Sequence, residues 1–215
     1  MNMAMLCMAR LPGSDFTFAS LNGIDGSELK IPRGRLTNTA LQSSTLYRAD
    51  LRGAHLAGAD LRGSILCDAD LSMDLEVGED FVDVDIDGNE HYYWTATPTD
   101  LSGANLSWTN LSGARFSGAN CESASFVSAT LHHVDFGDCV EWVREERPDG
   151  VEDEIRHGST CLRNADLSNS DLRFSSLEGA NLDRANFSGA RITGGAMIVD
   201  DLTRRGALGA NATRL

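Results

Sequence analysis

Three copies of a five-residue unit follow one another between residues 49 and 63, as Ala49-Asp50-Leu51-Arg52-Gly53, Ala54-His55-Leu56-Ala57-Gly58 and Ala59-Asp60-Leu61-Arg62-Gly63. In the same phase, the chain holds 23 such units, centred on every fifth residue over 41–71, 101–136 and 162–197. Every centre is apolar, and the residue two positions earlier is Ala, Ser, Thr or Gly in 22 of the 23 units. The repeat is therefore continuous apart from two interruptions.

A period of five matches neither an α-helix, with 3.6 residues per turn, nor a strand, with a period of two. It requires a backbone that turns a corner once in every unit. Each unit then directs one large and one small side chain inward, while the polar residue between them faces outward. Four corners close a square coil, and successive coils stack about 4.8 Å apart, the spacing of hydrogen-bonded strands. The sequence therefore predicts an all-β solenoid whose core is one continuous apolar column.

These Ala-(Asp/Asn)-(Leu/Phe)-x-x units resemble the pentapeptide-repeat family. Further examples are Ser102-Gly103-Ala104-Asn105-Leu106 and Asn164-Ala165-Asp166-Leu167, and the resemblance covers about two thirds of the chain. It implies a right-handed quadrilateral β-helix. The fold class expected is thus a pentapeptide-repeat solenoid with two inserted loops and a short C-terminal helical cap.

The expected organisation is a single solenoid domain over residues 1–215. Before Leu41 the pattern is patchier, and Gly26 to Arg35, with Pro32, breaks the phase, so we expect an irregular bulge there. The resulting parts are an irregular N-terminal coil (1–38), coils at 39–72, 99–137 and 160–199, insertions at 73–98 and 138–159, and a cap at 200–215. In the topoisomerase-protecting branch of the family a C-terminal element carries the dimer contact, which here implies Ile198, Val199, Leu202 and Leu208.

The two insertions add 25 and 21 residues to the repeat and are separated by eight units. Eight units are two full coils, so both insertions leave the same edge of the coil, about 10 Å apart. Residues 73–98 hold eight acids and no base, and residues 138–159 hold eight acids and three arginines. Half of the 32 acids of the chain therefore lie in the insertions, and the remainder, with 16 acids and 15 bases, is nearly neutral.

The first insertion reads as a β-hairpin, because Phe81 to Ile86 alternates, Asp87-Gly88 is a turn pair, and His91 to Thr95 suits a return strand. The second has a turn at 147–150, although a short helix fits it nearly as well. Aromatic residues among acids favour a partner-binding surface over disordered or decorative loops. The partner-binding residues expected are Asp80, Asp83, Asp85, Asp87, Glu90, Tyr92, Tyr93 and Trp94 in the first insertion, and Trp142, Glu145, Glu146, Asp149, Glu152, Asp153 and Glu154 in the second.

Other chemistry is weakly supported. Asp83, Asp85 and Asp87 follow the spacing of an EF-hand calcium loop, but its twelfth position, normally Glu, is Trp94. Five residues around the second insertion could in principle bind zinc: His132, His133, Cys139, His157 and Cys161. Their spacing matches no familiar zinc-binding motif. No nucleophile elbow, phosphate-cradling glycine motif or His-Glu metal helix is present in the sequence. We therefore expect neither a metal, nor a cofactor, nor catalysis.

Charge and cysteine usage restrict the function further. The net charge of −14 argues against direct binding to nucleic acid or to an anionic membrane. Five cysteines in no paired spacing suit a reducing compartment, and no apolar stretch predicts a leader or a membrane span, so a cytoplasmic protein is expected.

The resemblance also bears on function. Qnr-type and MfpA-type members of the family bind DNA gyrase and topoisomerase IV and protect them from quinolones or natural poisons. This implies a non-catalytic, homodimeric topoisomerase-binding resistance factor. Because the coil body is nearly neutral, we expect the contact in the acidic insertions rather than in a DNA-like rod. The alternative is a structural or adaptor solenoid with another protein partner.

Overall fold

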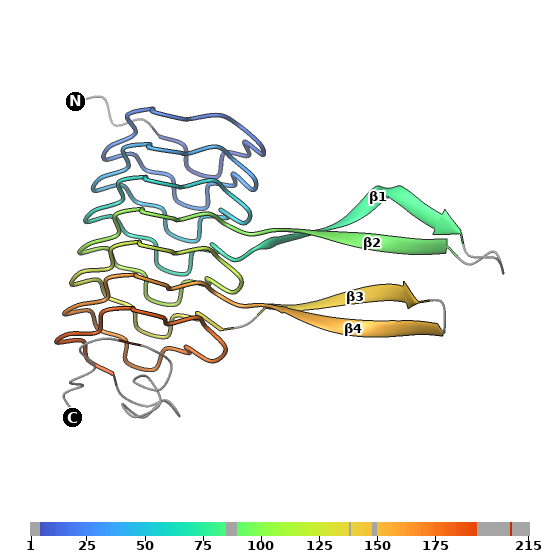
Figure 1. Ribbon diagram of the computed structural model, residues 1–215. Helices are drawn as coiled ribbons and strands as arrows, with labels where there is room; N and C mark the ends of the chain where they lie inside the picture. Colours follow the sequence, from blue (N-terminus) through green and yellow to red (C-terminus); the bar gives the residue numbers. More distant parts are fainter. Residues whose placement is uncertain (1–4, 85–89, 138, 148–149, 193–206, 208–215) are drawn as a thin grey trace.

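The chain forms a solenoid of stacked square coils from which two long hairpins project (Figure 1). The computed structural model describes residues 5–84, 90–137, 139–147, 150–192 and 207. Parallel bridges join each coil to the next at intervals of 20 residues, as between Asp50 and Asp70. The interval grows to 45 residues between His55 and Asp100 and to 41 between Asn120 and Cys161, because the insertions lie there. The coils are thus continuous across both insertions.

The core is the column of centres and small residues predicted from the repeat. Leu56, Leu61 and Leu106 are fully buried, as are Ala54 and Ala59 at the small positions. Burying one leucine side chain contributes about 1.5–3 kcal/mol, and stacking the coils accumulates this contribution along the axis. Halfway along the column, three buried phenylalanines pack together, with ring centroids 4.9–5.9 Å apart: Phe116, Phe126 and Phe136.

Each corner is a four-residue turn that begins at the centre. In the unit at Leu51, the amide of Ala54 donates to the Leu51 carbonyl at 3.1 Å, and the second corner residue, Gly53, has φ +63°. That geometry is a type II turn, which favours glycine at its third position. Bulky residues also occupy this strained position, among them Trp108 at φ +57° and Phe174 at φ +64°.

The Asp or Asn at the polar position of the unit completes the hydrogen bonding of the corner. The ladder uses the amides of the centre, the second corner residue, the small residue and the polar residue, but not that of the first corner residue. An Asp or Asn at the polar position accepts this remaining N–H, as Asp60 does from Arg62 at 3.2 Å and Asn110 from Ser112 at 3.2 Å. Such side-chain turns explain why the repeat prefers Asp and Asn.

The N-terminal coil is regular, and the bulge expected at 26–35 is a wrong prediction. Bridges run in phase from Met5↔Asp25 through Lys30↔Asp50. At Gly26 the large and small positions exchange roles, because buried Ile24 fills the core and a Cβ on Gly26 would lie 2.8 Å from Leu46 Cδ2. Pro32 is accommodated because it is a first corner residue, whose N–H the ladder does not need.

Both insertions are antiparallel hairpins. Strand β1 (Asp74–Val84) pairs with β2 (Glu90–Thr97), and β3 (Cys139–Arg147) pairs with β4 (Gly150–Gly158). The β1–β2 register shifts between Val77 and Val82, whereas the β3–β4 register is unbroken. The expected C-terminal cap and dimer residues Ile198, Val199, Leu202 and Leu208 lie outside the described residues.

Candidate partner-binding site

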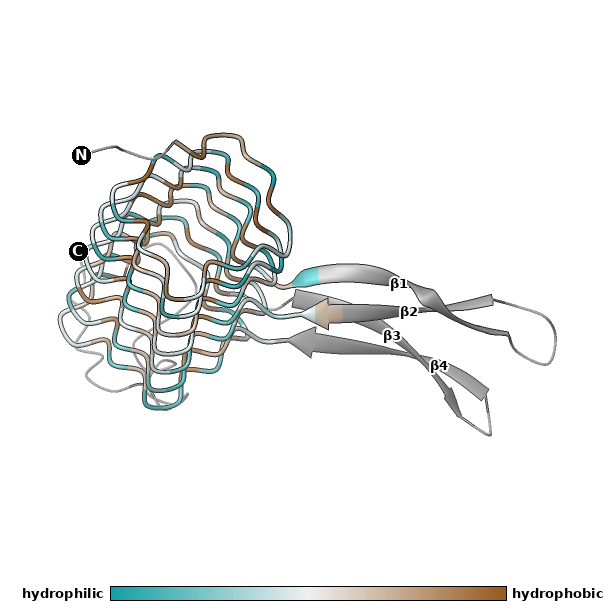
Figure 2. Cartoon of the chain, turned by 90° about the horizontal axis from the view of Figure 1, so that it is seen from above, coloured by the Kyte–Doolittle hydropathy of each residue, from teal (hydrophilic) through white to brown (hydrophobic). Residues whose placement is uncertain are grey.

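The two hairpins leave the same side of the solenoid and run alongside each other (Figures 1 and 2). Hairpin 1 (β1 and β2) leaves the coil after Met73, whose amide still donates to the Ser117 carbonyl, and hairpin 2 (β3 and β4) leaves it after Gly137. Their exits are two coils apart, because Asp70 bridges to Arg115 and Arg115 bridges to Asp135. Strand β2 contacts strand β3, so the hairpins meet along their inner strands. The acid-rich segments of the chain therefore lie on one continuous projection.

The root of each hairpin is held by a buried threonine at the point where the chain re-enters the coil. At hairpin 1, Thr99 Oγ1 accepts the Gly53 amide at 2.8 Å and lies 2.7 Å from the Ser72 carbonyl. At hairpin 2, Thr160 Oγ1 accepts the Gly118 amide at 3.2 Å and lies 3.1 Å from the Gly137 carbonyl. The hydroxyl thus joins the departing chain, the returning chain and the preceding coil.

Hairpin 1 has a second attachment, an ion cluster at its base. Asp74, the first residue of β1, accepts from Arg33 Nε at 2.7 Å and lies 3.7 Å from Arg52 Nη1. Its side chain is only 14% exposed, so this pair is screened less than a surface pair. Arg52 is itself held by Asp50 at 2.9 Å, and that hydrogen bond raises the pKa of the guanidinium.

The residues that hold the hairpin roots were not among the candidates predicted from the sequence, although the sequence does mark the two threonines. A threonine stands at the small position directly after each insertion, at 99 and at 160, where alanine is the commonest residue elsewhere in the repeat. Asp74 offered no comparable signal, because its partners Arg33 and Arg52 lie in coils that only the stacking brings to the hairpin base.

The candidate residues of hairpin 1 lie on both of its strands. Asp80 and Asp83 are in β1, and Glu90, Tyr92, Tyr93 and Trp94 are in β2. The register places Asp83 opposite His91, Val82 opposite Tyr92 and Val77 opposite Trp94. Asp85 and Asp87 lie outside the described residues. The backbone thus brings Asp83, Glu90, Tyr92 and Trp94 into one ladder, whereas Asp80 and Tyr93 fall at the register shift.

Hairpin 2 gathers its candidates in the same way. Trp142, Glu145 and Glu146 are in β3, Glu152, Asp153 and Glu154 are in β4, and Asp149 is outside the described residues. The register places Glu145 directly opposite Glu152. Like charges at facing positions of an antiparallel pair oppose pairing.

Metal and membrane chemistry receive no structural support in the described part of the chain. Across 5–84, 90–137, 139–147, 150–192 and 207, no group of three or more His, Cys, Asp or Glu side chains is arranged to hold a metal. Over the same residues, no helix combines the length and the apolar character that a membrane span requires.

Comparisons with known proteins place the chain among repeat solenoids. The family described as Pentapeptide repeats matches with eight copies over residues 35–72, 104–140 and 160–195. Curated protein sequences give no significant match. Among solved structures, the chain is similar to HetL, a pentapeptide repeat protein involved in heterocyst differentiation regulation from the cyanobacterium Nostoc. The TM-score is 0.70 at 26% identity, over 99% of this chain and 70% of HetL.

Two further structures share the coil at lower similarity. QnrB1, a plasmid-mediated fluoroquinolone resistance protein, matches over 91% of this chain and 79% of its own, with TM-score 0.47 and 18% identity. A pentapeptide repeat protein from the Arabidopsis thaliana thylakoid lumen matches over 65% of this chain and 70% of its own, with TM-score 0.37 and 25% identity. Pentapeptide-repeat proteins fold as right-handed β-helices, which is the class that the resemblance implies.

Proposed function

The chain belongs to the pentapeptide-repeat family, and from this premise we propose that it is a non-catalytic protein that binds a protein partner through hairpins 1 and 2. The observation that carries the proposal is the position of the hairpins, which leave one side of the coil and meet along β2 and β3. Attachment of both roots to the solenoid supports the proposal, because a partner then meets two hairpins that start from fixed positions, which lowers the entropy cost of association.

The charge of the hairpins defines the partner. Sixteen of the 32 acids lie in residues 73–98 and 138–159, against three arginines, whereas the coil body is nearly neutral. Such a projection attracts a surface rich in Lys and Arg and accelerates the encounter with it. The same charge disfavours nucleic acid, so the partner is a basic protein surface.

The first candidate partner is a type II topoisomerase, DNA gyrase or topoisomerase IV. The DNA-gripping surface of such an enzyme is rich in Lys and Arg, and the resemblance to the topoisomerase-protecting branch of the family points to the same target. In this role the protein is cytoplasmic, dimerises through Ile198, Val199, Leu202 and Leu208, and frees the enzyme from a quinolone or a natural poison.

The second candidate is a regulatory adaptor with another basic protein partner. The observation that favours it is the similarity to HetL, which extends over 99% of the chain with a TM-score of 0.70. An adaptor needs the same rigid coil and the same hairpins, so the two candidates differ in the partner and share the binding surface.

Supercoiling by purified gyrase in the presence of a quinolone separates the two candidates. We expect the protein to restore supercoiling at stoichiometric concentration. The combined variant Asp83→Asn, Asp85→Asn, Asp87→Asn and Trp94→Ala should abolish this protection. The matched control, Glu178→Gln with Asp183→Asn, removes acids from exposed coil positions and should protect fully.

Three other outcomes are informative. Full protection by the hairpin variant contradicts the hairpin mechanism. Inhibition of gyrase without protection points to mimicry of DNA by the coil. No effect of the parent protein at any concentration rejects the topoisomerase as partner and leaves the adaptor.

A further inference from the structure

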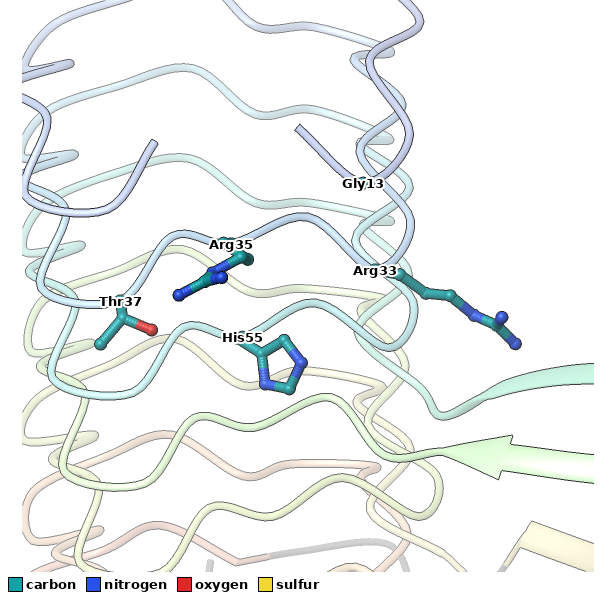
Figure 3. Close-up of a pocket in the computed structure, with 5 residues that line it drawn as sticks. All are labelled: Gly13, Arg33, Arg35, Thr37 and His55. Carbon is teal, nitrogen blue, oxygen red and sulfur yellow. The ribbon is translucent and has the colours of Figure 1, made fainter. Parts of the chain in front are cut away.

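A hollow of about 350 Å³ lies on the coil near the root of hairpin 1 and is lined by Gly13, Arg33, Arg35, Thr37 and His55. Arg35 and His55 come from adjacent coils and lie next to each other, with Thr37 at one side (Figure 3). Arg33 points away from them, toward the hairpin strand, where Asp74 holds it. Gly13 has no neighbour within 4 Å of its Cβ direction, so the hollow is open at this corner.

Arg35 and His55 are unusual residues for the positions that they occupy. Both are polar residues of the unit, bridged to each other in one column that continues as Asp15, Asp100 and Asn120. Bridged positions in neighbouring coils are about 4.8 Å apart, so the arginine and the histidine stand side by side on the surface of the coil. The column thus gathers donors and positive charge where the repeat normally places an acceptor.

The same substitutions leave a backbone donor without its usual acceptor. Where Asp or Asn stands at the polar position, it accepts the N–H of the first corner residue, as Asp15 does from Thr17 at 2.9 Å. Arg35 has no acceptor atom in its side chain, and the His55 ring accepts no hydrogen bond from the Ala57 amide. In the described part of the chain, the amides of Thr37 and Ala57 have no hydrogen-bond acceptor.

The adjacent column provides an internal comparison. Arg10 and Lys30 are also bridged cations at polar positions. Their first corner residues are Pro12 and Pro32, which have no N–H. One cationic pair is therefore followed by prolines and the other by corner amides. Such amides also lack an acceptor at Tyr47 and Val127 in the described part of the chain, but only in the hollow do they lie beside a cationic pair.

Two carboxylates lie near the hollow, and neither neutralises it strongly. Asp15 lies 3.6 Å from Arg35 Nε, but both side chains are more than half exposed, so the pair contributes little. Asp100 accepts from the Ser102 amide at 3.0 Å and from Asn120 at 3.2 Å. Among the described residues, no ion pair joins Asp100 to His55.

We propose that this hollow binds an oxyanion, a carboxylate or a phosphate group. Its oxygens take the place of the missing Asp or Asn carboxylate, accepting from the Thr37 amide and hydroxyl and from the Arg35 guanidinium. His55 adds a further donor on the next coil. The anion is either a free ion or an acidic side chain of a bound protein, and both present the same group to the hollow.

Titration of the full chain with inorganic phosphate tests the proposal, with the ring resonances of His55 followed by NMR. The exposed His133, on a different corner, is the internal control. We expect a saturable shift of His55 and none of His133. Arg35→Gln should weaken binding about tenfold, the usual effect of losing a hydrogen bond to a charged group. Arg163→Gln, which removes an arginine paired with Glu122 at 2.6 Å, should bind like the parent.

Thr37→Pro keeps the test independent of charge. Proline is native at the equivalent positions 12 and 32, so the variant should fold, and it removes the proposed amide donor. We expect weaker phosphate binding with an unchanged melting temperature. Parallel titration with a short Asp/Glu peptide separates the sources, because tighter binding of the peptide indicates a protein side chain and tighter binding of phosphate a free ion. A linear shift, or equal shifts of His55 and His133, overturns the proposal.

Discussion

Removing the hydroxyl of Thr99 while keeping its shape, as in Thr99→Val, should destabilise the root of hairpin 1. Thr99 is fully buried, and its Oγ1 accepts the Gly53 amide at 2.8 Å while donating to the Ser72 or Leu51 carbonyl. Without the hydroxyl, the Gly53 N–H retains only a 3.3 Å contact with the Ser72 carbonyl.

The magnitude follows from these contacts. Loss of the donated hydrogen bond costs about 1 kcal/mol, and the poorly satisfied buried N–H adds about 1–3 kcal/mol. The additional buried methyl group of valine offsets about 0.8 kcal/mol. The free energy of unfolding should therefore fall by about 2 kcal/mol.

Thr109→Val is the matched control. Thr109 is also buried, but its hydroxyl only donates, to the Leu61 carbonyl at 2.9 Å, which keeps the Ser64 amide as a second partner. We expect a loss below about 1 kcal/mol, because no buried donor loses its acceptor. Urea denaturation of both variants gives the comparison, and hydrogen exchange at Gly53 localises it.

Exchange of the Gly53 amide should accelerate in Thr99→Val, while that of Gly58, bonded to the Ser102 carbonyl at 2.9 Å, should not. Equal destabilisation by the two variants, or unchanged exchange at Gly53, would refute the idea that the threonine anchors the hairpin.

Three further predictions concern the coil. Burial raises the pKa of Asp171, but hydrogen bonds from Arg173 and His132 outweigh it and lower the pKa to about 2. This carboxylate therefore stabilises the fold above about pH 4. Its contribution, on the order of 1 kcal/mol, is lost as the pH falls from about 4 to about 2. In urea denaturation, the stability of Asp171→Asn should therefore depend less on pH between about 4 and 2 than that of the parent. Trp108 is 68% exposed at φ +57°. Trp108→Gly should raise the melting temperature, because this conformation costs a bulky residue about 1 kcal/mol; an unchanged or lower value would show that the side chain packs usefully. Phe126 makes edge-to-face contacts with Phe116 at 5.9 Å and with Phe136 at 5.8 Å. Their loss in Phe126→Leu should cost on the order of 1 kcal/mol in urea denaturation, and a neutral result would show that the core refills the space.

The period of the sequence was sufficient to predict the coil and the side from which the hairpins leave. A five-residue unit with one large and one small apolar position has few backbone solutions, and eight units between the insertions fix their common edge. The extra lengths counted in the sequence reappear as the enlarged bridge intervals that follow His55 and Asn120. The number of repeat units between the two insertions therefore predicted that both hairpins leave the coil at the same edge.

The five-residue pattern gave a wrong prediction at residues 26–35 because it required a large apolar side chain at every centre and a small one two positions earlier. At Gly26 the centre is empty, and Ile24 and Leu46 supply the volume from a small position and from the next coil. The core requires filled volume across the coil rather than a particular residue at each centre. Pro32 likewise departs from the repeat consensus without removing a hydrogen bond of the ladder.

The oxyanion hollow and the ion cluster at Asp74 were missed for a different reason. Their residues come from separate units, and each looks ordinary within its own unit. Aligning positions one coil apart brings Arg35 beside His55, and only the hydrogen-bond pattern shows that the Thr37 amide lacks an acceptor among the described residues. The informative comparison is between columns, where prolines follow one cationic pair and amides follow the other.

The insertions are tolerated because of where they enter the unit. Hairpin 1 enters between the second corner residue, Met73, whose amide still donates to the Ser117 carbonyl at 3.0 Å, and the small residue, Thr99. This replacement of the corner leaves the bridges of the coil intact before and after it, as at Asp70↔Arg115 and His55↔Asp100. The corner hydrogen bond that this replacement removes is substituted by the hydroxyl of Thr99 or Thr160. An acidic projection can therefore be added to a neutral coil with its charge kept away from the core, and the coil can present it in a fixed direction. This separation of stability from charge is what the proposed contact with a partner requires of the hairpins.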